Sequence, residues 1–157
     1  MSITILSGRK AVKLSDLVPQ ETKQRAAASL HIHWLRAKDV FSSMGDIGDC
    51  PYLDFNMRSS NIIGKAIFTS RTIQLNPVYL SSSDIKVVDN ILYETVIHEI
   101  AHHVAWRLYK EPRHGQAWKD VMVNLGIPPN RLYLEELPDW AQVKQQRIET
   151  ILGITIK

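Results

Sequence analysis

Three histidines and two glutamates occur in the otherwise apolar segment 93–109, YETVIHEIAHHVAWRLY. Residues four positions apart lie one turn above each other on an α-helix, so the imidazoles of His98 and His102 can reach one metal ion. Glu99 projects beside that ion instead of at it. From there its carboxylate could take a proton from a metal-bound water. The spacing therefore supplies two metal ligands and a general base.

The residues around this H-E-x-x-H motif favour a metal site over chance polar residues on an exposed helix. The motif is typical of zinc proteases. The apolar residues that flank it are Val96, Ile97, Ile100, Ala101, Val104 and Ala105. Ionisable groups in such surroundings cost several kcal/mol to desolvate unless they are paired or bound to a metal. We therefore predict a metal-binding helix.

A catalytic zinc site usually has three protein ligands and one position for water, so a third ligand is needed. His103 points about 100° away from His102 around the helix, which makes it a poor ligand and suits a supporting or surface position. Glu111, in the loop after the helix, remains a candidate. His114 is the better one, because it follows the short loop YKEPR and an antiparallel return would bring it over the metal face. Gly115 beside it permits close backbone approach.

Two further polar features have alternative interpretations. Glu94 lies one turn before His98 and could accept the outer N–H of that imidazole, as metal ligands usually require, or it could be an exposed helix residue. The spacing does not decide between these roles. His31 and His33 would diverge by about 200° on a helix and cannot share an ion, so we expect ordinary packing or surface residues.

A long helix is predicted over residues 20–41, where helix-forming residues predominate. Its apolar residues at helical spacing are Ala27, Leu30, Trp34 and Val40. The turn-rich loop 45–51 follows, and then three β-prone runs, YLDFNM, KAIFTS and TIQLN. The last two are joined through Ser70 and Arg71 and predict a hairpin with one apolar face. Asn76 ends the second strand, where a turn or helix-entry role is expected.

The motif helix should extend over residues 84–108, with N-cap oxygens offered by residues 81–84. A second helix is predicted over 114–126, followed by prolines, and a final helix after Pro138. These elements predict the α+β class. The expected fold is a small zincin-like metalloprotease fold, in which a short antiparallel sheet of about three strands packs on the active-site helix and flanking helices.

Composition limits the class of protein. With 157 residues and 45% apolar content, we expect one domain over residues 1–157. Cys50 is the only cysteine, which excludes an internal disulfide and a cysteine-pair zinc ribbon made from this chain alone. No apolar run approaches the roughly 20 residues of a membrane span, and the first residues lack a secretory signal. The expected protein is soluble and cytoplasmic, or in the host cytoplasm if it is phage-encoded.

The net charge is +3, and residues 1–41 contain seven Lys or Arg against three acids. This mild excess is compatible with a DNA partner and equally with a solvated helix face. Protein or peptide is the expected substrate. The sequence leaves open the oligomeric state, the cleavage specificity and the source organism.

Three stretches together resemble the SprT-like metallopeptidases, whose eukaryotic relatives include Spartan. They are GKAIFTSRTIQLNPVYL, ETVIHEIAHH and HGQAWKDVMVNLGIPPNR, in that order, within about residues 61–131. The resemblance implies that His98, His102 and His114 bind Zn²⁺ and that Glu99 is the catalytic residue. Trp118 would be the aromatic of the His-Gly-x-x-aromatic segment, with packing as its expected role. Many family members continue into a cysteine-rich zinc ribbon, which this chain lacks.

Three hypotheses about function remain. The first is a zinc metalloendopeptidase of the H-E-x-x-H type, for which the resemblance implies substrates bound or crosslinked to DNA. The second is a zinc-stabilised DNA-binding or adaptor module without peptidase activity. The third is a structural helix without metal. We favour the first, in which zinc polarises the scissile carbonyl while Glu99 moves a proton from water to the leaving amine.

Overall fold

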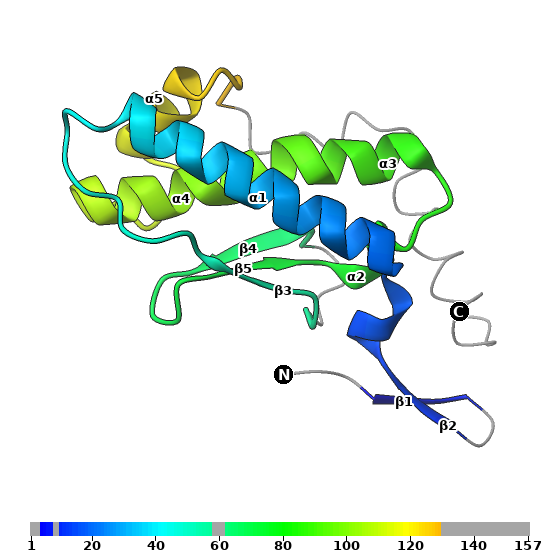
Figure 1. Cartoon of the computed structure of the whole chain (residues 1–157). Helices are drawn as coiled ribbons and strands as arrows, with labels where there is room; N and C mark the ends of the chain where they lie inside the picture. The colour runs from blue at the N-terminus through cyan, green and yellow to red at the C-terminus, as the bar shows by residue number, and fades with distance from the viewer. Residues whose placement is uncertain (1–3, 8–9, 58–61, 130–157) are drawn as a thin grey trace.

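The computed structural model describes residues 4–7, 10–57 and 62–129 (Figure 1). In chain order the elements are β1 (Thr4–Ser7), β2 (Lys10–Lys13), the 3-10 helix η1 (Leu14–Leu17), α1 (Gln20–Val40), β3 (Tyr52–Asp54), β4 (Gly64–Ile67), β5 (Thr72–Leu75), α2 (Pro77–Leu80), α3 (Ile85–Asn90), the π-helix η2 (Ile91–Thr95), α4 (Val96–Tyr109) and α5 (Gln116–Asn124). The α+β class is confirmed. The final helix expected after Pro138 lies outside the described residues. None of the helices in the described part of the chain is long and apolar enough to cross a membrane.

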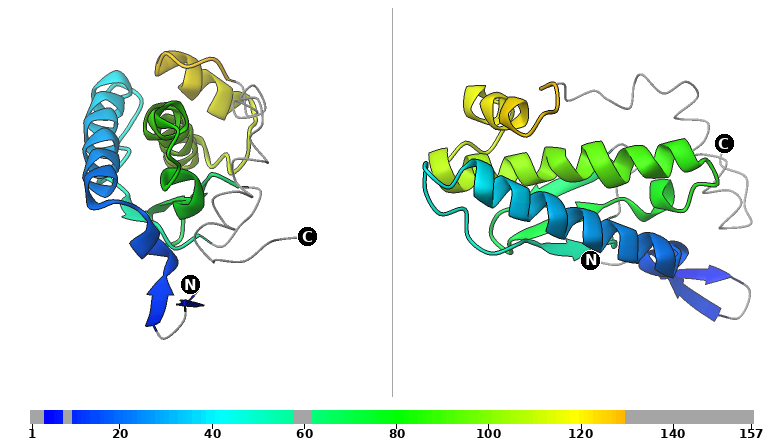
Figure 2. Two further views of the ribbon diagram at one scale, coloured as in Figure 1. Left: turned by 90° about the vertical axis from the view of Figure 1, so that its right-hand side faces the viewer. Right: turned by 45° about the horizontal axis from the view of Figure 1, so that its top comes forward.

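Helices cover one face of a three-stranded sheet. Figure 2 shows α1 beside the long helix formed by α3, η2 and α4, with the sheet beneath them and α5 across α4 on the side away from the sheet. The shared core contains large, fully buried side chains from every layer, among them Phe41, Ile73, Leu75, Ile97, Ile100, Val104, Trp118 and Met122. The motif helix therefore has protein on several sides.

The sheet has β5 at its centre and is mixed, which corrects the antiparallel prediction. The hairpin of β4 and β5 is antiparallel as expected, and Ala66 pairs with Ile73. On the other side, β3 is parallel to β5, with Leu53 paired to Ile73. Alternation of apolar residues carries no information about the direction from which a strand enters a sheet, so the pattern could not distinguish the two pairings. The hairpin β1–β2 was also not predicted.

The residues of α1 that face the core are only partly the predicted ones. Leu30 and Trp34 are buried as expected, and Ala26 and Ala37 complete the buried set within the helix. Ala27 is exposed, and Val40 is 39% exposed. Residues 26–28 are all alanine, so periodicity could not choose which of them faces the core.

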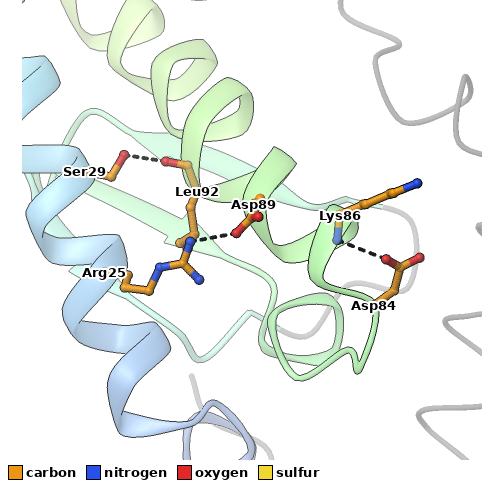
Figure 3. Close-up of polar contacts among 6 residues, drawn as sticks. All are labelled: Arg25, Ser29, Asp84, Lys86, Asp89 and Leu92. Atoms are coloured by element: carbon orange, nitrogen blue, oxygen red, sulfur yellow. Dashed lines mark hydrogen bonds and ion pairs between the residues drawn. The ribbon is translucent and has the colours of Figure 1, made fainter.

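The motif helix agrees with its predicted bounds. Asp84 is the N-cap, and its Oδ1 accepts a hydrogen bond from the backbone N–H of Lys86 at 2.9 Å (Figure 3). The helix ends at Lys110, which adopts the left-handed conformation with φ 57°. Its N–H and that of Glu111 donate to the last turn of the helix. The π-helix η2 within this long helix was not predicted.

Candidate metal centre

Three imidazoles from two elements meet at one point. His98 and His102 lie on α4, and His114 lies in the loop just before α5. The Nε2 atom of His114 is 3.1 Å from Nε2 of His98 and 3.1 Å from Nε2 of His102. Nitrogens bound tetrahedrally at zinc distances would be about 3.3 Å apart. The three nitrogens are therefore spaced to bind one metal ion.

Burial keeps the imidazoles of His98 and His102 neutral. Desolvation lowers the pKa of His98 to about 3, and the neighbouring His114 lowers it further. Desolvation likewise lowers the pKa of His102 to about 3, with smaller contributions from the other histidines around it. A neutral imidazole has one nitrogen lone pair, and a metal ion requires that lone pair. The rings of His98 and His102 therefore stay in the neutral form that metal binding requires, even at pH values well below 7.

Glu99 lies beside the three nitrogens, with its side chain almost fully buried. Its Oε2 is 3.9 Å from Nε2 of His98. Burial raises the pKa of Glu99 to about 8, because the charged carboxylate loses its hydration. The group therefore holds a proton at neutral pH in the metal-free chain, and a cation nearby would favour its ionised form. This is the arrangement expected of a general base next to a metal.

Gly64, the first residue of β4, allows the sheet to approach Glu99. A Cβ at position 64 would lie 2.7 Å from Cγ2 of Thr95 and 3.0 Å from Oε2 of Glu99. Both distances are shorter than ordinary van der Waals contact, so a larger residue would displace the strand or the carboxylate. This role of Gly64 was not predicted from the sequence. A glycine at the start of a β-prone run is a weak signal of close approach.

Trp118 packs against all three imidazoles. Its ring centroid is 4.8 Å from that of His98, 5.4 Å from that of His102 and 4.5 Å from that of His114. Its Nε1–H donates to the backbone carbonyl of His98 at 3.4 Å. Trp118 is buried, as its packing role predicted, but what it packs against is the set of candidate ligands. Because His114 lies in the loop before α5, helical spacing gave no signal of this contact.

The other titratable candidates do not join the three histidines. His103 is buried and not on the surface, and its Nε2–H donates to the backbone carbonyl of Thr72 in β5 at 3.0 Å. Glu94 accepts a hydrogen bond from Nδ2 of Asn90 at 3.1 Å within its own helix. Neither residue contributes a ligand atom to the cluster formed by the described residues.

Glu111 lies against Gly115 and outside the set of converging ligand atoms. A Cβ at position 115 would lie 1.5 Å from Oε1 of Glu111, so the glycine makes room for this carboxylate. His31 is exposed, and His33 packs edge-on against Tyr93 at 5.5 Å. Neither belongs to the cluster, as expected for ordinary packing or surface residues.

Asn76 has the predicted helix-entry role. Its Oδ1 accepts a hydrogen bond from Val78 N at the start of α2 at 3.1 Å, and its Nδ2 donates to the carbonyl of Ile62 at 2.8 Å. Asn76 thus fixes the segment that leads into Gly64.

The chain is similar in sequence to the SprT-like family and to bacterial proteins named SprT. The model of the SprT-like family matches residues 40–135. "Protein SprT" of Salmonella arizonae is 36% identical over 89 residues, which are 55% of this chain and 51% of that protein. "Protein SprT" of Cronobacter sakazakii has the same identity and coverage, and that of Salmonella newport is 34% identical over 85 residues, 53% of this chain and 48% of the relative. The chain thus spans about half the length of the curated relatives it matches. No solved structure shows significant similarity.

The buried carboxyl group predicts how Glu99→Gln affects the metal-free protein. The unfolded chain ionises this group near its ordinary pKa of 4.5, whereas the folded chain keeps it protonated to about pH 8. Unfolding therefore releases a proton between these values, and the free energy of unfolding of the wild type falls as the pH rises through them. Glutamine does not titrate. We expect the variant to gain stability over the wild type by at most about 1.4 kcal/mol per pH unit from pH 4.5 to 8, measured by urea unfolding in a chelator. An equal difference at pH 5 and pH 8 would contradict the buried, protonated carboxyl.

The contact at Gly64 predicts overpacking in Gly64→Ala. We expect a loss of about 1–3 kcal/mol in unfolding free energy, because the new methyl group meets Cγ2 of buried Thr95. Thr95→Ser removes that carbon and is the matched background. There the same alanine substitution should cost at least about 0.5 kcal/mol less. Equal costs in both backgrounds would show that the contact is not the cause.

Proposed function

This chain belongs to the SprT-like family, and we propose that it is a zinc-dependent metallopeptidase that hydrolyses peptide bonds. One observation supports this function above the others. The Nε2 atoms of His98, His102 and His114 converge next to the buried carboxyl group of Glu99. Three ligands with an adjacent base are the minimum set for metal-assisted hydrolysis.

The donor set suits zinc. Imidazole nitrogens are borderline-soft ligands, and the Nε2 atoms of His98 and His102 each lie 3.1 Å from that of His114, close enough for the three to hold one zinc ion. When bound, zinc supplies Lewis acidity toward a carbonyl oxygen and makes a neighbouring water more acidic. His98, His102 and His114 would hold the ion. Trp118 packs against all three rings and would limit their rotation.

In this proposal Glu99 transfers a proton from the attacking water to the leaving amine. Its Oε2 lies 3.9 Å from Nε2 of His98, so the oxygen would be close to a water held by an ion at the three imidazoles. The carboxylate takes one proton from that water as it attacks the scissile carbonyl, and then gives a proton to the departing amine. The contact of β4 at Gly64 restricts the carboxyl group to this side of the helix. Positioning and proton transfer thus reside in the same buried side chain.

The proposed substrates are proteins, including those bound or crosslinked to DNA, in the cytoplasm. The family resemblance is the main support for this substrate class, and the basic excess in residues 1–41 adds weak support. The competing proposal is a zinc-stabilised DNA-binding or adaptor module without peptidase activity. The peptidase and the adaptor module differ in whether Glu99 takes part in a reaction.

Glu99→Gln separates these two functions. We expect the zinc-loaded variant to keep one zinc per chain and to cleave a fluorescently labelled unfolded protein roughly 10²–10⁴-fold more slowly than the wild type, with or without added DNA, because the proton acceptor is gone. Glu94→Gln is the matched control, since it makes the same change one turn away on the same long helix. It should cleave at the wild-type rate. If the wild type does not cleave while binding zinc and DNA, the adaptor module is the better description.

His114→Ala tests the third ligand. We expect its zinc affinity, measured by competition with a chromogenic chelator, to fall at least about 100-fold, more than loss of an outer-sphere partner would cause. His31→Ala removes an exposed imidazole of α1 and should leave zinc affinity unchanged. Wild-type affinity in His114→Ala would refute the three-histidine centre.

A further inference from the structure

The helix that carries the metal ligands contains one π-helical turn, η2 (Ile91–Thr95), directly before α4. At this turn the N–H of Val96 donates to the carbonyls of Ile91 and Tyr93. In an α-helix it would donate to the residue four positions back, which is Leu92. Because of the π turn, the Leu92 carbonyl does not receive the hydrogen bond from the Val96 N–H that an α-helix would supply.

Ser29 of α1 supplies a donor to that carbonyl. Its hydroxyl group donates a hydrogen bond to the backbone oxygen of Leu92 across the interface between the two helices (Figure 3). A serine within a helix commonly donates to a carbonyl of its own preceding turn instead. Here the hydroxyl is directed at the neighbouring helix, at the residue whose α-helical bond is lost.

Two further contacts flank this bond on the same face of α1. One turn earlier, Nη2 of Arg25 lies 2.6 Å from Oδ1 of Asp89. One turn later, the ring of His33 packs on that of Tyr93 at 5.5 Å. Arg25, Ser29 and His33 are four residues apart, so they form one row along α1. This row of α1 contacts the long helix over α3 and η2. There the hydrogen bonds of the long helix change from the α-helical to the π-helical pattern.

The π turn determines which way the metal ligands face. Val87, Ile91, Thr95, Glu99 and His103 follow one another at a spacing of four along the long helix and are all buried, and burial within α4 is continuous over residues 99–105. In an unbroken α-helix each step of four advances the face by about 40°, or about 160° over this stretch. One extra residue in the π turn reverses about 100° of that drift. Val87 and Glu99 can therefore both face the interior.

We propose that Ser29 is a positioning residue of the metal centre. By holding the carbonyl of Leu92, it stabilises the π register, and this register sets the rotation of His98, Glu99 and His102 relative to α1 and the sheet. The inference rests on the metal-binding part of the proposed function and not on peptide hydrolysis. The Arg25–Asp89 pair has a lesser role, because both side chains are about half exposed and their attraction is screened.

The test compares Ser29→Ala with Ser29→Thr, which keeps the hydroxyl, and with Ser81→Ala. Ser81 is a buried serine whose Oγ donates to the carbonyl of Val78 at 2.8 Å, so its loss removes the same kind of bond from another part of the fold. Alanine is the strongest helix former, and Ser29→Ala should therefore leave α1 intact. Zinc affinity is measured by chelator competition, and the ligand geometry by the visible absorption spectrum of the cobalt(II)-loaded chain.

We expect Ser29→Ala to bind zinc roughly three- to tenfold more weakly and to show an altered cobalt(II) spectrum. Ser29→Thr should restore both properties. Ser81→Ala should lower the melting temperature by a similar amount while leaving zinc affinity and spectrum unchanged. If Ser29→Ala loses thermal stability but retains wild-type affinity and spectrum, the positioning role is refuted and the bond is only structural. Failure of the wild type itself to bind zinc would instead refute the metal centre on which this role rests.

Discussion

Convergence of four titratable side chains at one partly buried point is the constraint on which the rest of this structure depends. Three imidazoles and one carboxyl group share a space between α4, the loop before α5, and β4, where Glu99 and His102 are buried and His98 and His114 are partly buried. Desolvation makes the imidazoles of His98 and His102 neutral and Glu99 protonated, so the metal-free chain avoids several buried charges. The same neutral nitrogens are directed at one another at close range and offer lone pairs to a cation. The chemistry follows from this environment more than from the motif alone.

Helix geometry alone does not assemble the centre. Spacing on α4 aligns two imidazoles, but the third requires the chain to reverse direction. The left-handed Lys110 ends α4, and the small Gly115 leaves room for the Glu111 carboxylate beside the returning backbone. Trp118 then anchors α5 against the rings through its bond to the carbonyl of His98. On the opposite side, Gly64 lets the edge strand touch the base. Each of these features is local, and each fixes one side of the candidate metal centre.

Sequence patterns predicted the parts of this fold that depend on local preference. The motif, the Asp84 cap and the length of the long helix all follow from short-range rules, and the structure agrees with them. Other features depend on partners that are distant in the chain. They are the direction of β3, the choice of alanine that faces the core in α1, and the π turn. The pairing of Leu53 with Ile73 and the bond from Ser29 to Leu92 leave no periodic trace. Trp118 was recognised as a packing residue, but which side chains it packs against depends on tertiary structure.

The relation between the metal centre and the core favours a catalytic centre over a structural one. In small zinc-stabilised modules the metal replaces a core, and the chain unfolds without it. Here Ile100 and Val104 of α4, together with Val121 and Met122 of α5, are fully buried next to the site and belong to a core that extends to the sheet and α1. This apolar contact holds α5 on α4 whether or not an ion is bound. The three nitrogens are therefore brought together by the fold itself, as the preorganised ligands of a catalytic centre would be. A chain that needed zinc only to fold would have no reason to bury Glu99 beside it.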